Sequence, residues 1–147
     1  MSLSEKNQTA FLIALNAEVE DCAKKAASAI FSKEPAATLS YPPNCGLTPA
    51  ETAALKQTAH SAHLESALRK LIADAVANGL FGALSIIDGV SDPDKKFGKW
   101  SGVVLEDLNE NEDSHREMLH DAFFDAYWNW RKLRPEKKWR LDVYDGK

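Results

Sequence analysis

The stretch that decides the fold is residues 64–89, LESALRKLIADAVANGLFGALSIIDG. Its apolar residues recur every three or four positions, which is the period of one helix face. Arg69, Lys70 and Asp74 mark a polar side in the first half, whereas the second half, LFGALSII, is apolar on nearly every side. Gly89 suits the left-handed position that ends a helix. The pattern predicts a central helix whose second half is enclosed by other elements.

Two glycines interrupt this apolar half. Gly79 and Gly82 each cost about 1 kcal/mol of helix propensity relative to alanine. Two such costs in one segment indicate a need for small residues. We therefore expect another backbone to approach the helix closely at this point.

A first helix is predicted over residues 5–32. Its apolar stripe contains Phe11, Leu12, Leu15, Val19, Cys22, Ala26 and Ile30. This pattern places Cys22 on a buried face, where a thiol is inert. Cys45 lies in a proline-rich loop and is expected to be more exposed. The sequence assigns a redox role to neither cysteine.

The segment that follows the loop begins with a strong helix start. Thr48 can cap the helix, Pro49 suits its first turn, and Glu51 can return a hydrogen bond to the cap backbone. From there to residue 89 the pattern fits either one long helix or two helices that meet near residues 60–63. The sequence leaves both arrangements open.

The last third predicts a helix followed by a short β element. Ser114, with Glu117 in the capping-box position, starts a helix that ends before Pro135. Residues 138–144, KWRLDVY, alternate apolar and polar side chains like a strand, and they could pair with residues 103–105. The predicted fold is mainly α: one globular domain over residues 1–147, a bundle of about four helices with a small C-terminal two-stranded β element. Residues 64–89 and 114–133 would form its core.

Composition bounds the class of protein. The chain has 147 residues, of which 44% are hydrophobic and 27% charged, and this is ordinary for a globular domain. Its formal net charge of −4 argues against a general binder of nucleic acid or of anionic membranes. No apolar run approaches the roughly 20 residues that span a bilayer, and no signal-peptide pattern is present. We expect a cytoplasmic protein with free thiols.

Charge is unevenly distributed. Residues 106–125 contain eight acids and one base, and residues 131–140 contain six bases and one acid. Clustered acids speed and orient encounter with a basic partner. The favoured function is a small acidic protein–protein interaction domain, an immunity-type or accessory protein that docks a basic partner. The candidate partner-binding residues are Asp88, Asp92, Asp94, Trp100, Glu106, Asp107, Glu110, Glu112 and Asp113. A homodimer is a second form of the same hypothesis, because the apolar helix faces look wide for one small domain.

A small helical enzyme, or a bundle that binds a ligand or metal, is the rival from another class. His60 and His63 share a helix face, and Glu117 and His120 have the spacing of one half of a di-iron motif. That motif needs a second copy, which this sequence lacks, so we predict no metal and no cofactor. His115, His120 and Asp121 could serve in acid–base chemistry, but no nucleophile motif or phosphate-binding loop accompanies them. The sequence favours a non-enzymatic role.

The C-terminal segment suggests a third hypothesis. Trp128, Trp130 and Trp139 are interleaved with Arg131, Lys132, Arg134, Lys137, Lys138 and Arg140. Aromatic rings among basic residues can bind single-stranded nucleic acid by stacking and phosphate contacts. The helical spacing of Trp130 with Phe123 and Leu133 favours the simpler interpretation, in which the rings belong to the core and the basic stems cover their edges.

Overall fold

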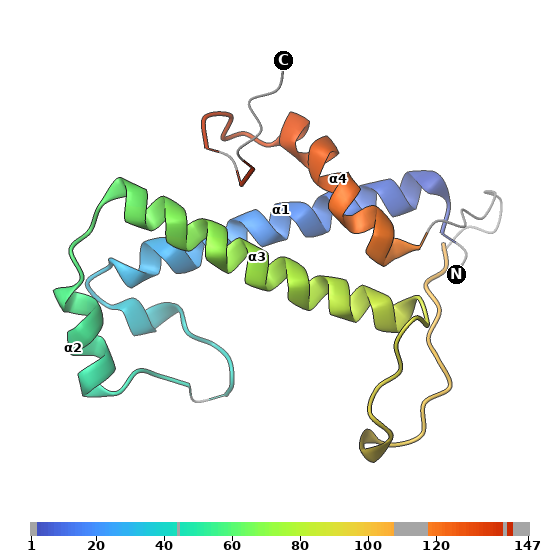
Figure 1. The fold of residues 1–147 in the computed structure, drawn as a ribbon, viewed down its shortest axis with the longest axis horizontal. Coiled ribbons are helices and arrows are strands. Elements are labelled where there is room, and N and C mark those ends of the chain that lie inside the picture. Colours follow the sequence, from blue (N-terminus) through green and yellow to red (C-terminus); the bar gives the residue numbers. More distant parts are fainter. Residues whose placement is uncertain (1–2, 44, 108–117, 140, 143–147) are drawn as a thin grey trace. The chain divides into compact units, whose positions relative to one another are not determined.

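The computed structural model is mainly helical, with four α-helices and no strand in the residues that it describes, 3–43, 45–107, 118–139 and 141–142. The helices are α1 (Glu5–Ile30), α2 (Pro49–Gln57), α3 (Ala62–Ile87) and α4 (Leu119–Leu133) (Figure 1). Two short 3-10 turns, η1 (Pro35–Thr38) and η2 (Lys95–Phe97), lie in the connections.

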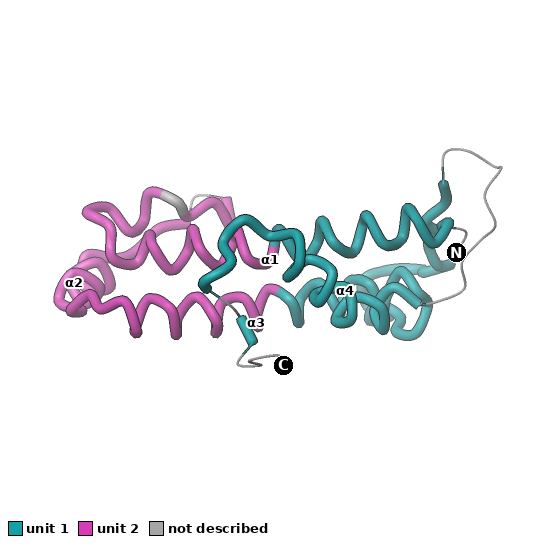
Figure 2. The backbone as a smooth tube through the Cα atoms, turned by 90° about the horizontal axis from the view of Figure 1, so that it is seen from above, with its two compact units in different colours: residues 1–18, 77–147 teal, residues 19–76 magenta. Residues whose placement is uncertain are grey.

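The chain divides into two compact units (Figure 2). Unit 1 contains residues 1–18 and 77–147, and unit 2 contains residues 19–76. Both α1 and α3 therefore contribute to each unit. The prediction of a single domain over the whole chain remains a prediction.

The helix starts and ends follow local chemistry. Thr48 forms the predicted capping box with Glu51, and α2 ends at Gln57, so residues 48–89 form two helices rather than one. At the end of α3, Gly89 has a φ of +71°. The Gly89 N–H donates to the Ile86 carbonyl and the Val90 N–H to the Ser85 carbonyl, a Schellman arrangement that ends the helix.

The small β element predicted near the C-terminus is not supported. Residues 103–105 have no strand conformation, and the described part of residues 138–144 contains bends. Arg134 donates to the Trp139 carbonyl and Lys137 to the Lys132 carbonyl, so this segment is hydrogen-bonded to the end of α4. The predicted helix start at Ser114 and Glu117 lies outside the described residues.

The core differs from the predicted one, because α1 supplies five of the twelve buried apolar side chains among the described residues and α3 only two. In unit 1 the buried apolar side chains are Leu3, Leu12, Leu84, Leu119, Ala122, Phe123 and Ala126. In unit 2 they are Val19, Ala23, Ala27, Ala29 and Ala73. Leu12 and Val19 of the predicted stripe of α1 are buried, but further along the helix Ala23, Ala27 and Ala29 are buried instead of Cys22, Ala26 and Ile30. Cys22 is exposed as a result, contrary to the prediction.

The second half of α3 is not enclosed as its sequence predicts. Leu84 and Ser85 are buried, but Asn78, Gly79 and Gly82 are exposed. A methyl group added at either glycine would meet nothing within 4 Å. The glycines therefore do not serve a close helix contact within the described part of the chain.

By length and composition α3 could cross a membrane. Its 26 residues include an 18-residue window with a mean hydropathy of 1.5, of which 17% is buried. This corrects the expectation that no segment reaches that length, because an average tolerates the charged residues that interrupt an apolar run. A core helix of a soluble protein passes the same test, so the finding assigns no location.

Candidate functional site

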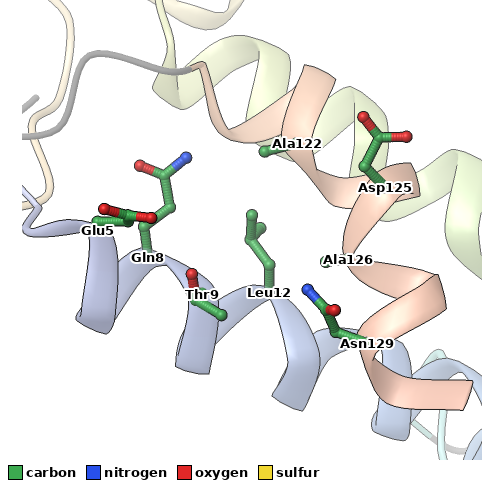
Figure 3. A pocket seen from close by; sticks show the side chains of 8 residues that line it. All are labelled: Glu5, Gln8, Thr9, Leu12, Ala122, Asp125, Ala126 and Asn129. Atoms are coloured by element: carbon green, nitrogen blue, oxygen red, sulfur yellow. The ribbon is translucent and has the colours of Figure 1, made fainter. Parts of the chain in front are cut away.

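The candidate site is a groove in unit 1 between the first turns of α1 and the middle of α4. Eight residues line it: Glu5, Gln8, Thr9, Leu12, Ala122, Asp125, Ala126 and Asn129. Figure 3 shows Gln8 and Leu12 rising from α1 toward α4, with Ala122 and Ala126 on the opposite helix. The buried floor of the groove combines Leu12, Ala122 and Ala126 with the polar Gln8, and its exposed rim is polar.

Small and buried residues position the two walls. Leu12 and Phe123 are almost fully buried, and Ala122 and Ala126 let α4 approach α1. The Asn16 side-chain amide donates to the Leu12 carbonyl and to the Phe123 carbonyl, each at 3.0 Å. A buried amide with two such bonds fixes the register of the two helices. The groove is therefore a built feature of unit 1 rather than a gap between mobile parts.

The rim of the groove is acidic. Glu5 on α1 and Asp125 on α4 are both exposed, and none of the eight lining residues is basic. The volume is about 190 Å³. Sites for whole small molecules usually measure about 300–1,000 Å³. The groove suits a single side chain or a small cation-bearing group better than a whole ligand.

A second polar cluster ties the end of α3 to the start of α4. The Asp88 side chain is 0% exposed, and its Oδ2 accepts from the His120 backbone N–H at 2.9 Å. The same oxygen lies 2.6 Å from His120 Nδ1. Because Met118 at the N-cap of α4 offers no side-chain bond, Asp88 supplies the acceptor that this helix end needs.

The environment of His120 favours a structural role. Its Nε2 lies 3.4 Å from an oxygen of Asp121, and the edge of Phe81 packs against the ring at a centroid distance of 5.4 Å. Both ring nitrogens thus face carboxylates. A general base needs a nitrogen directed at a substrate, and neither nitrogen has that freedom here.

The histidines of the enzyme hypothesis lie in different units. In unit 2, His60 Nε2 is 2.7 Å from Glu65, which also accepts from the Ser28 hydroxyl at 2.9 Å. These hydrogen bonds lower the pKa of Glu65, with the His60 bond the largest cause. His63 is exposed, and Glu117 and His115 lie outside the described residues. Among the residues that the structure describes, no group of three His, Cys, Asp or Glu side chains could hold a metal ion.

Some of the acids predicted to bind a partner are hydrogen-bonded within unit 1, and others are exposed. Asp107 accepts from the Ser4 backbone N–H at 3.0 Å, and bonds to Asn7 and Ser4 lower its pKa. Asp94 caps η2 through the Lys96 N–H, which lowers its pKa. Asp92 and Glu106 are exposed. Glu110, Glu112 and Asp113 lie outside the described residues.

The C-terminal basic residues are partly engaged within unit 1. Arg134 is 1% exposed and donates to the Trp139 carbonyl. The Arg131 guanidinium lies 5.5 Å from the Trp128 ring and 3.4 Å from Asp142. The guanidinium groups lie over the rings themselves rather than along their edges, so the simpler interpretation stays a prediction. Trp128 itself remains exposed.

Sequence reasoning missed the groove residues of α1. Glu5 and Asp125 are separated by most of the chain, and only the packing of α1 on α4 brings them to one groove. Asp125 was visible as part of the acidic run in residues 106–125, but Glu5 carried no comparable signal. The chain matches no protein-family model, no curated protein and no solved structure.

Proposed function

We propose that this chain is a protein–protein interaction domain that docks a basic partner, and that the groove of unit 1 receives a lysine or arginine side chain of that partner. The observation that carries the proposal is the charge of the groove: acids on both helices, no base among its lining residues, and room for one long side chain. The apolar floor of Leu12, Ala122 and Ala126 would contact the methylene stem, while the rim acids pair with its charged end.

The rim acids would speed the approach of a basic partner and would disfavour binding of acidic proteins. Exposed ion pairs contribute modestly to affinity, but complementary charge raises the association rate and rejects acidic competitors. The net charge of the whole chain, −4, would also attract a basic partner. A cytoplasmic location, as predicted from the sequence, is part of this proposal.

The test compares two double variants of equal charge. Glu5→Gln with Asp125→Asn neutralises the groove, whereas Glu18→Gln with Glu34→Gln removes the same charge at exposed positions elsewhere. Each protein is used as bait in the native host lysate, at low and at physiological salt. Affinity for the captured partner is then measured by titration calorimetry.

We expect a partner with a basic surface whose affinity falls about twofold to thirtyfold in the groove variant, the range of two exposed ion pairs. The control variant should bind like the parent protein. Recovery of no partner at either salt concentration would count against the proposal. Equal weakening by both variants would exclude the groove as the docking site.

A further inference from the structure

The loop that follows α3 carries an unusual combination of exposed side chains. Residues 95–100 read KKFGKW, so lysines alternate with two aromatic residues. Phe97 is 75% exposed and Trp100 is 39% exposed. Figure 1 shows this part of unit 1 as a long excursion beyond the end of α3, with the turn η2 on it. The loop therefore presents apolar rings to solvent, between basic side chains.

Aliphatic residues extend this apolar surface along the same loop. Val90, Val103 and Val104 are all exposed, with Val104 at 60%. Isolated exposed apolar residues are ordinary, but this loop exposes five of them, two of which are large aromatic rings. The turn itself is held in shape, because Asp94 Oδ1 accepts from the Lys96 N–H at 2.9 Å. Phe97 is thus exposed by a defined turn.

The charge of residues 91–100, the tip of this loop, is opposite in sign to that of the whole chain. In this stretch Lys95, Lys96 and Lys99 outnumber the acids Asp92 and Asp94, and the next exposed acid is Glu106. Lys96 Nζ lies 3.0 Å from Asp94, which leaves Lys95 and Lys99 beside Trp100 around an open hollow of the loop. Asp92 and Asp94 line the same hollow. The three lysines of residues 95–100, next to the exposed rings, complement an anionic surface.

We propose that this loop docks on an anionic lipid bilayer, with Phe97, Trp100 and the valines inserted at the headgroup level and the lysines on the lipid phosphates. Aromatic side chains favour the membrane–water interface, and lysines are attracted to the negative surface of the cytoplasmic leaflet. The net charge of the whole chain predicts that it avoids anionic membranes, but residues 91–100 carry a positive charge of their own.

Other occupants fit the loop less well. Nucleic acid would use the rings for stacking, but the exposed valines offer no stacking surface. A second copy of the chain would place the lysines of one loop against those of the other in a two-fold contact. A stable protein interface needs about 20–30 residues on each side, far more than the tip of this loop supplies. Insertion into a bilayer needs only a few apolar side chains.

The test is co-sedimentation of the full chain with vesicles at low ionic strength. One set is phosphatidylcholine alone, and the other is equimolar phosphatidylcholine and phosphatidylserine. We expect binding to the mixed vesicles and little to the neutral ones. Quenching of Trp100 by brominated lipid, lost in Trp100→Phe, should show that the loop enters the interface.

Two loop variants and two matched controls test whether the loop is the part of the chain that contacts the vesicle. Replacing Lys95, Lys96 and Lys99 by Gln should weaken binding about a hundredfold, since each lysine near the surface is worth roughly fivefold. Phe97→Ser should weaken it about tenfold. The controls are Gln at the exposed Lys6, Lys33 and Lys56, and Ser at the exposed Leu133. Circular dichroism verifies that every variant is folded.

Three results would overturn the proposal. The first is the absence of binding to the mixed vesicles, and the second is equal weakening by loop variants and controls. The third is that the lysines and Phe97 are required instead for binding a single-stranded oligonucleotide or for dimer formation in light scattering.

Discussion

The bond network between Asp88 and His120 should be a principal source of stability in unit 1, and Asp88→Ala tests this directly. The substitution removes the acceptor of the His120 backbone N–H at 2.9 Å and of the imidazole Nδ1 at 2.6 Å. Because the Asp88 side chain is fully enclosed, water cannot readily replace the lost oxygen. The start of α4 would then keep an unsatisfied N–H inside the protein.

The magnitude follows from the two bonds. Loss of a helix-capping acceptor costs about 1 kcal/mol. Loss of a buried hydrogen bond to a carboxylate costs about 1.5–3 kcal/mol. The free energy of unfolding should therefore fall by about 3 kcal/mol. For a chain of this length each kcal/mol lowers the midpoint of thermal unfolding by roughly 2–4 °C, so we expect a loss of about 6–12 °C.

Urea and thermal unfolding followed by circular dichroism measure the effect, and a double-mutant cycle with His120→Ala isolates the ring–carboxylate contact. We expect a coupling energy of about 1 kcal/mol or more between the two side chains. Asp92→Ala, at an exposed position in the adjoining loop, is the matched control and should change stability by less than about 0.5 kcal/mol. A loss in Asp88→Ala no larger than that of the control, or a coupling near zero, would refute the reasoning.

Three other substitutions probe separate features. Gly89→Ala should lower the free energy of unfolding by about 1–2 kcal/mol in urea titrations, because its φ of +71° is strained for a residue with a Cβ; an unchanged midpoint would contradict this. Asn16→Ala should cost about 1–2 kcal/mol through its two lost bonds, and a neutral effect would show that the amide does not hold α1 on α4. Burial, and next the bond to Asp142, raise the pKa of Tyr127 to about 12. Because the folded chain keeps this proton above the ordinary tyrosine pKa, stability should fall as the pH rises from about 10 to 12. In ultraviolet titrations Asp142→Asn should lower the pKa of Tyr127, and an unchanged titration curve would exclude the bond as a cause.

Local signals in the sequence predicted the helical class and several boundaries. The capping box of Thr48 and Glu51 and the left-handed Gly89 depend on chemistry within a few residues, so they can be read without the fold. Burial depends on neighbours far along the chain, and there the sequence misled. The stripe of α1 places Cys22 inside, whereas packing buries Ala23 and Ala27 and exposes the thiol.

The same distinction holds for the candidate site. Asp88 could be named from its place at the end of an apolar helix, but its partner His120 could not, because 32 positions separate them. The groove depends even more on tertiary packing, since Glu5 comes from the first turn of α1 and Asp125 from α4. The apolar half of α3 predicted enclosure, yet composition alone cannot distinguish a helix face that packs on the protein from one that is exposed.

The hydrogen bonds between Asp88 and His120 also affect which changes in the length of the chain unit 1 can tolerate. These hydrogen bonds hold the end of α3 next to the start of α4, so the connection between the two helices begins and ends at the same place in unit 1. Doubling the length of a surface loop costs only about 0.6 kcal/mol of closure entropy. Insertions or a transplanted binding segment between residues 98 and 103 should therefore leave the helices of unit 1 in place. The same hydrogen bonds make this connection a natural position for a graft, or for new ends in a circularly permuted chain.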